Sequence, residues 1–182
     1  TDSTQPLTET SPKSPENLHG VMHLARELMF QTLVTPLAIV RPTLVYGARD
    51  PHNGYGPNKF RRLANNSETI VLFGKGEEQR DHVMVDDVAE LTIRIIKHGS
   101  TGVLTAATGN VTSFRAVADK VVELSAKKAV IKDSARNGPM PHNGYRAFSA
   151  EATKTAFPDF NYTPIWDGLK KVQAEEFGHG AR

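Results

Sequence analysis

The sequence predicts an α/β protein, because short apolar segments alternate with amphipathic helical ones along the chain. Residues 36–40 form an unbroken apolar run, which is typical of a strand buried on both faces of a parallel sheet. A helical segment precedes this run, and Leu24, Leu28 and Met29 form its apolar stripe. Residues 70–87 then contain a strand, a tight turn, a second strand and an acidic helix start.

Composition limits the kinds of protein this chain can be. Its 182 residues suit one compact domain or slightly more, and hydrophobic residues make up 38%, which is enough for a core. The net charge is only +2 and both signs are interspersed, so no nucleic-acid partner is expected. The chain has no cysteine, which excludes disulfides, thiolate nucleophiles and cysteine-ligated zinc.

The sequence also gives an expectation for location. No apolar run approaches the ~20 residues that a membrane span requires, and no signal peptide opens the chain. We therefore expect a cytoplasmic protein with no membrane partner. The chain begins at Thr1 and not at Met, so its natural start is expected to lie elsewhere.

Serine residues mark the predicted starts of several helices. Ser14, followed by Pro15, is expected to cap the N-terminal helix. Ser113 is expected to cap a helix over residues 114–125, and Ser149 a short helix further along.

Two glycines and an arginine within residues 70–87 suit an anionic ligand. Gly74 and Gly76 allow a tight turn and a close approach of the backbone, and Arg80 presents a guanidinium beside that turn. A guanidinium binds phosphate through paired hydrogen bonds, so this order favours a phosphate or diphosphate. By contrast, no Gly-x-Gly-x-x-Gly follows a predicted strand, so the usual dinucleotide-binding motif is absent.

Several motifs together resemble one protein family. The strongest are residues 41–47 (Arg-Pro-Thr-Leu-Val-Tyr-Gly) and 73–87, with weaker ones at 109–113, 146–149 and 157–169. In this order they resemble the NAD-dependent epimerase/dehydratase family of extended short-chain dehydrogenase/reductases, over nearly the whole chain. The resemblance implies the last parallel strand and the active-site helix of a Rossmann-type sheet, joined to a small mixed α/β region that binds the substrate.

The resemblance also implies that the chain is the C-terminal portion of such a protein, lacking the Gly-rich NAD-binding half. Residues 1–46 would be a remnant of the dinucleotide-binding domain, and residues 47–182 the nucleotide-sugar-binding region. The strand at residues 37–40 would lack a neighbour on one side, and an unpaired apolar edge favours aggregation. We therefore expect stable folding only with the missing half, in cis or as a separate fragment.

The active-site helix of the family carries a Tyr-x-x-x-Lys motif. Its tyrosine exchanges a proton with a sugar hydroxyl while hydride moves to or from the nicotinamide. By the resemblance, His19 takes the tyrosine position and His23 the lysine position, with Glu27 one further turn along. Residues 19 and 23 share one helix face, so the geometry is kept while both chemical groups change.

Three interpretations of His19 and His23 remain open. His19 can replace the tyrosine as an acid–base group, because imidazole exchanges protons near neutral pH. The i, i+4 spacing also occurs in helical zinc sites, but neither a third ligand nor His-Glu-x-x-His is evident, so no metal is expected. In the third interpretation both are ordinary polar residues in a site that has lost activity.

The substrate-binding residues expected from the resemblance are Phe73, Arg80 and Arg146. The arginines would bind the diphosphate and Phe73 would line the nucleotide base pocket. Each has a simpler alternative: Arg80 in an exposed ion pair with Glu77 or Glu78, Arg146 as a solvated loop charge, and Phe73 as a core residue.

The cofactor implied is NAD or NADP, bound mainly by sequence absent from this chain. At the end of the predicted strand, Pro42, Thr43 and Leu44 would approach its nicotinamide. Arg61 and Arg62 lie on a basic helix near the expected opening of the substrate site, and the simpler alternative is a solvated helix face. Asp86 and Asp87 are expected to serve a helix start and not the chemistry.

The function implied is NAD-dependent epimerisation or dehydration of a nucleotide-diphosphate sugar, with this chain alone inactive. The alternative is an inactive homologue that still binds the nucleotide sugar, and a third possibility is a structural fragment without a ligand. Members of the family commonly form homodimers through a four-helix bundle that includes the active-site helix. The apolar stripe of the first helix would suit that bundle, although packing within the chain explains it equally well.

Overall fold

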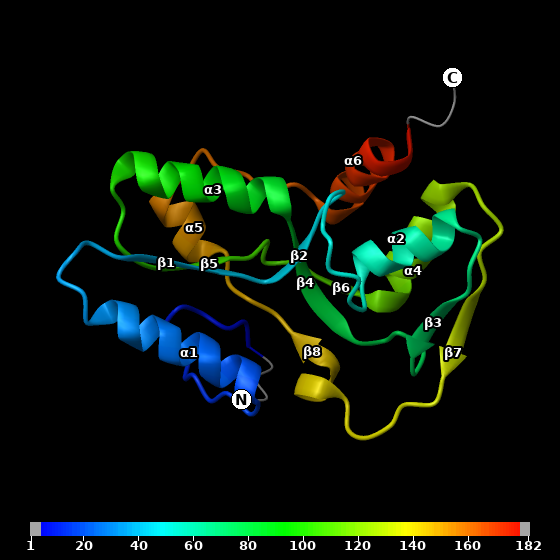
Figure 1. Ribbon diagram of the computed structural model, residues 1–182, viewed down its shortest axis with the longest axis horizontal. Helices are drawn as coiled ribbons and strands as arrows, with labels where there is room; N and C mark the ends of the chain where they lie inside the picture. The colour runs from blue at the N-terminus through cyan, green and yellow to red at the C-terminus, as the bar shows by residue number, and fades with distance from the viewer. Residues whose placement is uncertain (1–4, 179–182) are drawn as a thin grey trace.

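Residues 5–178 are described by the computed structural model, which has a mixed α/β architecture (Figure 1). Its helices are α1 (Leu18–Gln31), α2 (Pro57–Asn65), α3 (Val85–His98), α4 (Phe114–Ser125), α5 (Glu151–Ala156) and α6 (Ile165–Phe177), with a 3-10 turn, η1 (Pro141–Gly144). The strands are β1 (Ala38–Pro42), β2 (Leu44–Tyr46), β3 (Ile70–Phe73), β4 (Gln79–Met84), β5 (Gly102–Ala106), β6 (Val111–Ser113), β7 (Ile131–Ser134) and β8 (Tyr145–Arg146).

The first sheet consists of β1 and β5, which pair in parallel from Ala38 opposite Gly102 to Pro42 opposite Ala106. In Figure 1, α1 lies on one side of this pair and α3 on the other. Within residues 5–178, no strand pairs with the second edge of β1. Because β5 lies beyond residue 46, the first sheet draws on both predicted regions, and their boundary stays a prediction.

The second sheet is centred on β4. This strand pairs in parallel with β2 and β8 and antiparallel with β6, so it joins segments that are far apart in the sequence. The strands β3 and β7 form a separate parallel pair at the far end of the molecule (Figure 1). The strand, turn, strand and helix predicted within residues 70–87 are therefore confirmed.

The main core lies among α2, α4, α6 and the second sheet. Tyr46, Phe60, Val117 and Leu169 are at most 1% exposed there, and burial of such side chains is the main force that stabilises the fold. Gly168 allows α6 to pack close to Tyr46 of β2, because a Cβ at that position would lie 1.9 Å from the Tyr46 hydroxyl oxygen. A smaller cluster, formed by Leu91, Ile95, Ala106, Phe157 and Phe160, joins α3 to the first sheet and α5.

The helix α1 has no buried residue. Leu24 in the predicted apolar stripe is half-buried, whereas Leu28 is 55% and Met29 70% exposed. Most of the apolar surface of this helix is therefore uncovered by the part of the chain that the structure describes.

The predicted helix caps had different outcomes. Ser113 is confirmed, because its hydroxyl accepts a hydrogen bond from the Ala116 amide at 3.1 Å. The prediction of Ser14 as the cap of the first helix was wrong. Asn17 is the N-cap of α1, since its side chain accepts a hydrogen bond from the Gly20 amide at 2.9 Å. Ser149 was also wrong, by one residue, because α5 has Ala150 at its N-cap while Ser149 Oγ accepts from the Glu151 amide.

Two burial predictions were wrong. The strand β1 is only partly buried, because it has a partner on one edge alone. Arg61 lies on the inner face of α2 and is fully buried, where it donates to Glu176 Oε2 at 2.7 Å and to the Val172 carbonyl oxygen at 3.1 Å. No helix within residues 5–178 has both the length and the apolar character needed to cross a membrane.

Candidate functional site

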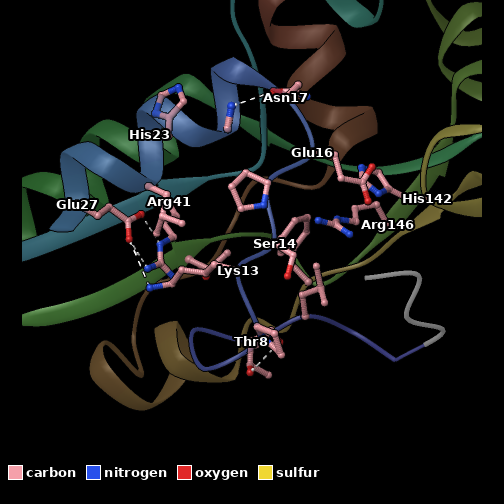
Figure 2. A pocket seen from close by; sticks show the side chains of 18 of the residues that line it. Thr8, Lys13, Ser14, Glu16, Asn17, His23, Glu27, Arg41, His142 and Arg146 are labelled. Atoms are coloured by element: carbon pink, nitrogen blue, oxygen red, sulfur yellow. Dashed lines mark hydrogen bonds and ion pairs between the residues drawn. The ribbon is translucent and has the colours of Figure 1, made fainter.

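A cavity of about 390 Å³ opens beside α1. It lies between that helix, the loop before it, the carboxyl end of β1 and β8. Its polar lining includes Lys13, Glu16, His23, Glu27, Arg41, His142 and Arg146. In Figure 2, Glu27 and Arg41 lie at one end of this cavity, and Glu16, His142 and Arg146 lie together at the other. The carboxyl end of a parallel strand is the usual place for a ligand in an α/β sheet.

Glu27 attaches α1 to the end of β1. Arg41 Nε donates to Glu27 Oε1 at 2.7 Å and Arg41 Nη2 donates to Oε2 at 2.5 Å, which makes the pair bidentate. Lys13 Nζ lies 3.6 Å from the same carboxylate. The hydrogen bond from Arg41 is the main reason that the pKa of Glu27 is lowered. This pair holds α1 over the cavity although the helix has no buried residue.

His19 and His23 contact each other on the exposed face of α1. Their Nε2 atoms are 3.2 Å apart, and Arg26 Nη2 lies 3.2 Å from His23 Nδ1. Because an arginine can only donate, His23 Nδ1 accepts, and a neutral His23 then carries its proton on Nε2. That proton is shared with His19 Nε2, so a neutral His19 carries its own proton on Nδ1.

The two histidines differ in their relation to the cavity. His23 lines it, whereas His19 does not. Within residues 5–178, no group of three or more His, Asp or Glu side chains is arranged to hold a metal ion. The zinc interpretation thus has no third ligand in the described part of the chain.

Arg80 lies within β4 and is only 8% exposed, so it is not the partner in a surface ion pair. Its Nη1 donates to the Gln79 carbonyl oxygen at 2.7 Å, and its Nη2 donates to Glu78 Oε1 and to the Pro141 carbonyl oxygen. Burial is the main cause that lowers the pKa of Arg80, and the charge of Glu78 opposes that effect.

Glu78 is shared between two arginines. It is buried, and its Oε2 accepts from Arg136 Nη1 at 3.3 Å while Oε1 accepts from Arg80. The preceding turn has Gly74 at φ +60° and Gly76 at φ +74°, a conformation that favours glycine, as the sequence predicted. In this structure the carboxylate of Glu78, which follows the same turn, therefore accepts the hydrogen bond that Arg80 was expected to donate to a phosphate.

Arg146 lies next to Arg80. The two residues are register partners in the parallel pairing of β4 with β8. Arg146 is half-buried, lines the cavity beside α1, and has its Cζ 6.0 Å from the centre of the Phe148 ring. Of these two arginines, only Arg146 lines the cavity.

Phe73 lies at the end of β3 and is 51% exposed, so it is not a core residue. Its ring stacks on Tyr55 with the ring centres 4.6 Å apart, and its amide donates to the Tyr55 hydroxyl at 3.1 Å. The aromatic pair offers an exposed flat surface near Arg136, which donates to the Phe73 carbonyl oxygen at 3.1 Å.

The three predicted cofactor residues differ in their surroundings. Pro42 lines the cavity beside α1, and Leu44 is 44% exposed at the start of β2. The Thr43 hydroxyl is 3.1 Å from Asp81 Oδ1, which also accepts from the Thr108 amide at 3.1 Å. Burial raises the pKa of Asp81. Thr43 thus takes part, through Asp81 of β4, in a structural link between β4 and the segment that contains Thr108.

Several site residues were missed by sequence reasoning. Lys13 and Arg136 lie in loops and His142 in the 3-10 turn η1, and no sequence pattern predicts their contacts. Asp87 accepts from the Thr163 amide and hydroxyl, both at 2.8 Å, so it fixes the loop before α6 as well as standing in the first turn of α3. The one signal available was the spacing of Glu27 from His23, which placed that carboxylate on the correct helix face.

Comparisons with known proteins agree with this geometry. Residues 1–107 match the family described as NAD dependent epimerase/dehydratase. The fold is similar to dTDP-glucose 4,6-dehydratase from Bacillus anthracis in complex with NAD, with a TM-score of 0.81 and 19% identity over 97% of this chain. It is equally similar to UDP-glucose 4-epimerase from Thermotoga maritima with UDP-glucose, at a TM-score of 0.81 and 21% identity over 97% of this chain.

A third structure of this kind is UDP-glucuronic acid 4-epimerase from Bacillus cereus, in complex with UDP-glucuronic acid and NAD. It has a TM-score of 0.80 and 18% identity over 96% of this chain, and 56% of its own length is covered. The chain spans 58% of each of the first two structures. Since more than half of the chain matches the family, the protein belongs to the NAD dependent epimerase/dehydratase family, with the Rossmann-like fold of its members.

Proposed function

We propose that this chain is the substrate-binding part of an NAD-dependent enzyme that epimerises or dehydrates a nucleotide-diphosphate sugar. The observation that carries the proposal is the pairing of Arg80 with Arg146 on neighbouring strands, with Arg146 lining the cavity beside α1. Two neighbouring guanidiniums suit a diphosphate, which carries at least two negative charges and many acceptor oxygens. The exposed ring of Phe73 is available to a nucleotide base.

Binding of the diphosphate requires a local rearrangement. Glu78 now accepts the hydrogen bond that Arg80 would offer to a phosphate oxygen. We expect the ligand to displace this carboxylate, which can keep its contact with Arg136. The nucleotide would then lie between Phe73 and the two arginines, with the sugar directed toward the cavity beside α1.

The acid–base groups proposed for the reaction are His19 and His23. A neutral His19 holds a proton on Nδ1 that it can donate, and His23 positions the ring through the shared proton. The residues on this chain suit only the nicotinamide end of the cofactor: Pro42 lies at the cavity, and no Gly-rich phosphate loop is present. When bound, NAD or NADP would accept and return hydride.

We further propose that a cofactor-binding half completes the fold. The free edge of β1 and the exposed apolar surface of α1 support this, because both require a neighbour in a stable fold. A homodimer through α1 is the alternative use of the same surface. A sharp, cooperative melt of the 182-residue chain as a monomer would count against both.

The test is turnover of UDP-, GDP- and dTDP-sugars with NAD by the chain together with its cofactor-binding half. We expect conversion of one class of nucleotide sugar, and loss of at least tenfold in kcat when His19→Phe is introduced. The matched control is His52→Phe, which replaces an exposed histidine that does not line the cavity. Unchanged turnover in His19→Phe would remove that residue from the mechanism.

The second candidate function is nucleotide-sugar binding without chemistry. It is favoured by the position of His19, which is exposed and outside the cavity lining. Binding of the nucleotide sugar with no conversion under any of these conditions would select this alternative. Absence of both binding and conversion would leave only a structural role for the chain.

A further inference from the structure

Asparagine is followed by glycine at three places in the chain: Asn53-Gly54, Asn137-Gly138 and Asn143-Gly144. Two of these pairs lie within the same five-residue sequence, Pro-His-Asn-Gly-Tyr, at residues 51–55 and 141–145. An asparagine before glycine is chemically labile, because glycine has no Cβ to hinder attack of its backbone nitrogen on the asparagine side chain. The repeated sequence therefore separates the effect of the fold on this reactivity from the effect of the neighbouring residues.

The first two pairs lie in irregular, exposed segments. Asn53 and Asn137 are both exposed and belong to no helix or strand. Within residues 5–178, neither the Gly54 amide nor the Gly138 amide donates a hydrogen bond. Each glycine nitrogen can therefore turn toward the side chain before it, because no backbone hydrogen bond has to break first.

Asn53 has an additional feature that favours the reaction. Arg62 Nη1 donates to Asn53 Oδ1 at 3.4 Å. This oxygen takes on negative charge when the side-chain carbonyl carbon is attacked, and a positive group placed at such an oxygen stabilises the charge. The guanidinium of Arg62 thus lies where the reaction at Asn53 develops its charge.

The backbone around the third pair is fixed. Asn143 lies in η1 at φ +49°, and its amide donates to the Met140 carbonyl oxygen at 3.1 Å. Gly144 is buried, and a Cβ at that position would lie 2.1 Å from Met140 Sδ, so the methionine side chain packs against it. The Gly144 nitrogen can attack the Asn143 side chain only when η1 opens locally, and this lowers the rate.

We propose that Asn53 and Asn137 are sites of spontaneous deamidation and that the fold protects Asn143. The glycine nitrogen forms a bond to the side-chain carbonyl carbon of the preceding asparagine and loses its proton to solvent. The bond from that carbon to Nδ2 then breaks, and the nitrogen leaves as ammonia. Water opens the resulting cyclic imide and gives aspartate or isoaspartate, so the whole reaction consumes one water and needs no oxidant or reductant.

Both proposed sites adjoin residues that contact Phe73. Asn53 lies shortly before Tyr55, whose ring stacks on Phe73, and Asn137 directly follows Arg136, which donates to the Phe73 carbonyl oxygen. Deamidation adds a negative charge, and isoaspartate also adds a methylene group to the backbone. The modification should therefore change the surroundings of Phe73, whether or not this ring binds a nucleotide base.

The experiment incubates the chain together with its proposed cofactor-binding half in mildly alkaline buffer and follows deamidation by mass spectrometry of proteolytic peptides. We expect Asn53 and Asn137 to react at least about tenfold faster than Asn143, because only Asn143 requires local opening. In urea that unfolds the protein, Asn53 and Asn143 should react at rates within about twofold of each other, because their neighbouring residues are the same.

Gly54→Val is the variant that tests the attacking nitrogen. Gly54 does not have a positive φ, and the nearest atoms to an added Cβ belong to the exposed His52 side chain, which can move. The branched side chain hinders the nitrogen, so the rate at Asn53 should fall by about tenfold. The rate at Asn137 should stay as in the parent, which makes it the internal control.

If Gly54→Val does not fold, judged by circular dichroism, the comparison of folded with unfolded parent decides the outcome alone. Equal rates at Asn53, Asn137 and Asn143 in the folded protein would overturn the proposal. So would a difference between Asn53 and Asn143 that persists in urea, or an unchanged rate at Asn53 in the folded variant.

Discussion

The region around α4 and the region around α1 differ in how much of their structure they support by themselves. The helix α4 buries Phe114, Val117 and Val121 against α2, α6 and the second sheet. The helix α1 has no buried residue and is held mainly by the pair of Glu27 with Arg41. The region around α4 is a closed hydrophobic core, whereas the region around α1 exposes apolar side chains and an unpaired strand edge.

This difference separates the proposed substrate site of this chain from its proposed catalytic helix. The proposed substrate site depends on β4, β8 and the turn before β4. These segments belong to the main hydrophobic core or lie next to it. The proposed catalytic helix and the cofactor residues belong to the region around α1. Nucleotide binding should therefore depend mainly on residues of this chain, while catalysis should also require the proposed cofactor-binding half.

The largest effect is expected from a matched pair of leucine substitutions in the two regions. Leu169→Ala removes a fully buried side chain and should lower the free energy of unfolding by about 2–5 kcal/mol. Leu28→Ala, at a position 55% exposed, should change it by less than about 0.5 kcal/mol. Urea unfolding monitored by circular dichroism measures both. A comparable loss in the two variants would mean that α1 is covered in solution, for example by a second copy of the chain.

The next effect concerns the attachment of α1 and depends on pH. The folded pKa of Glu27 is below its ordinary value of 4.5, so the pair with Arg41 contributes its full stability above that pH. As the pH falls through the lowered pKa, the carboxylate is protonated and about 1 kcal/mol is lost. The protection factors of the α1 amides, which are exchange rates corrected for their intrinsic pH dependence, should fall in this range in the parent and be low at all pH values in Glu27→Gln. Protection in α1 of the parent that does not change on acidification would contradict the role of this pair.

The smallest effect sharpens the description of the substrate region. Glu78→Gln removes the carboxylate that occupies Arg80 while keeping the size of the side chain. Because the diphosphate no longer competes with a charge, UDP should bind several-fold more tightly, on the order of 0.5–1 kcal/mol. Glu77→Gln on the same turn is the control, since Glu77 is exposed and has no contact with Arg80 in the structure. Weaker UDP binding in Glu78→Gln would mean that Glu78 positions Arg80 for the ligand.

The sequence predicted local structure well where the signal lies within one segment. The Ser113 cap and the glycine turn before β4 were both predicted from neighbouring residues. The family itself followed from the order of such segments.

The parts that failed depend on contacts between distant segments. Arg61 could not be recognised as buried, because its partner Glu176 lies on α6. The pairing of Glu78 with Arg136 likewise arises only when loops and strands meet. The partial burial of β1 follows from its pairing on one edge alone within residues 5–178.

The most direct measurement is a calorimetric titration with UDP of the chain together with its proposed cofactor-binding half, repeated with Arg80→Ala and Arg146→Ala. We predict saturable binding by the parent and a loss of about tenfold or more in each variant, because each removes a charge-assisted contact to the diphosphate. Arg49→Ala, at an exposed arginine outside the cavity, should bind UDP as the parent does. Absence of UDP binding by the folded parent, or equal affinity in all four proteins, would contradict the claim that this chain holds the nucleotide.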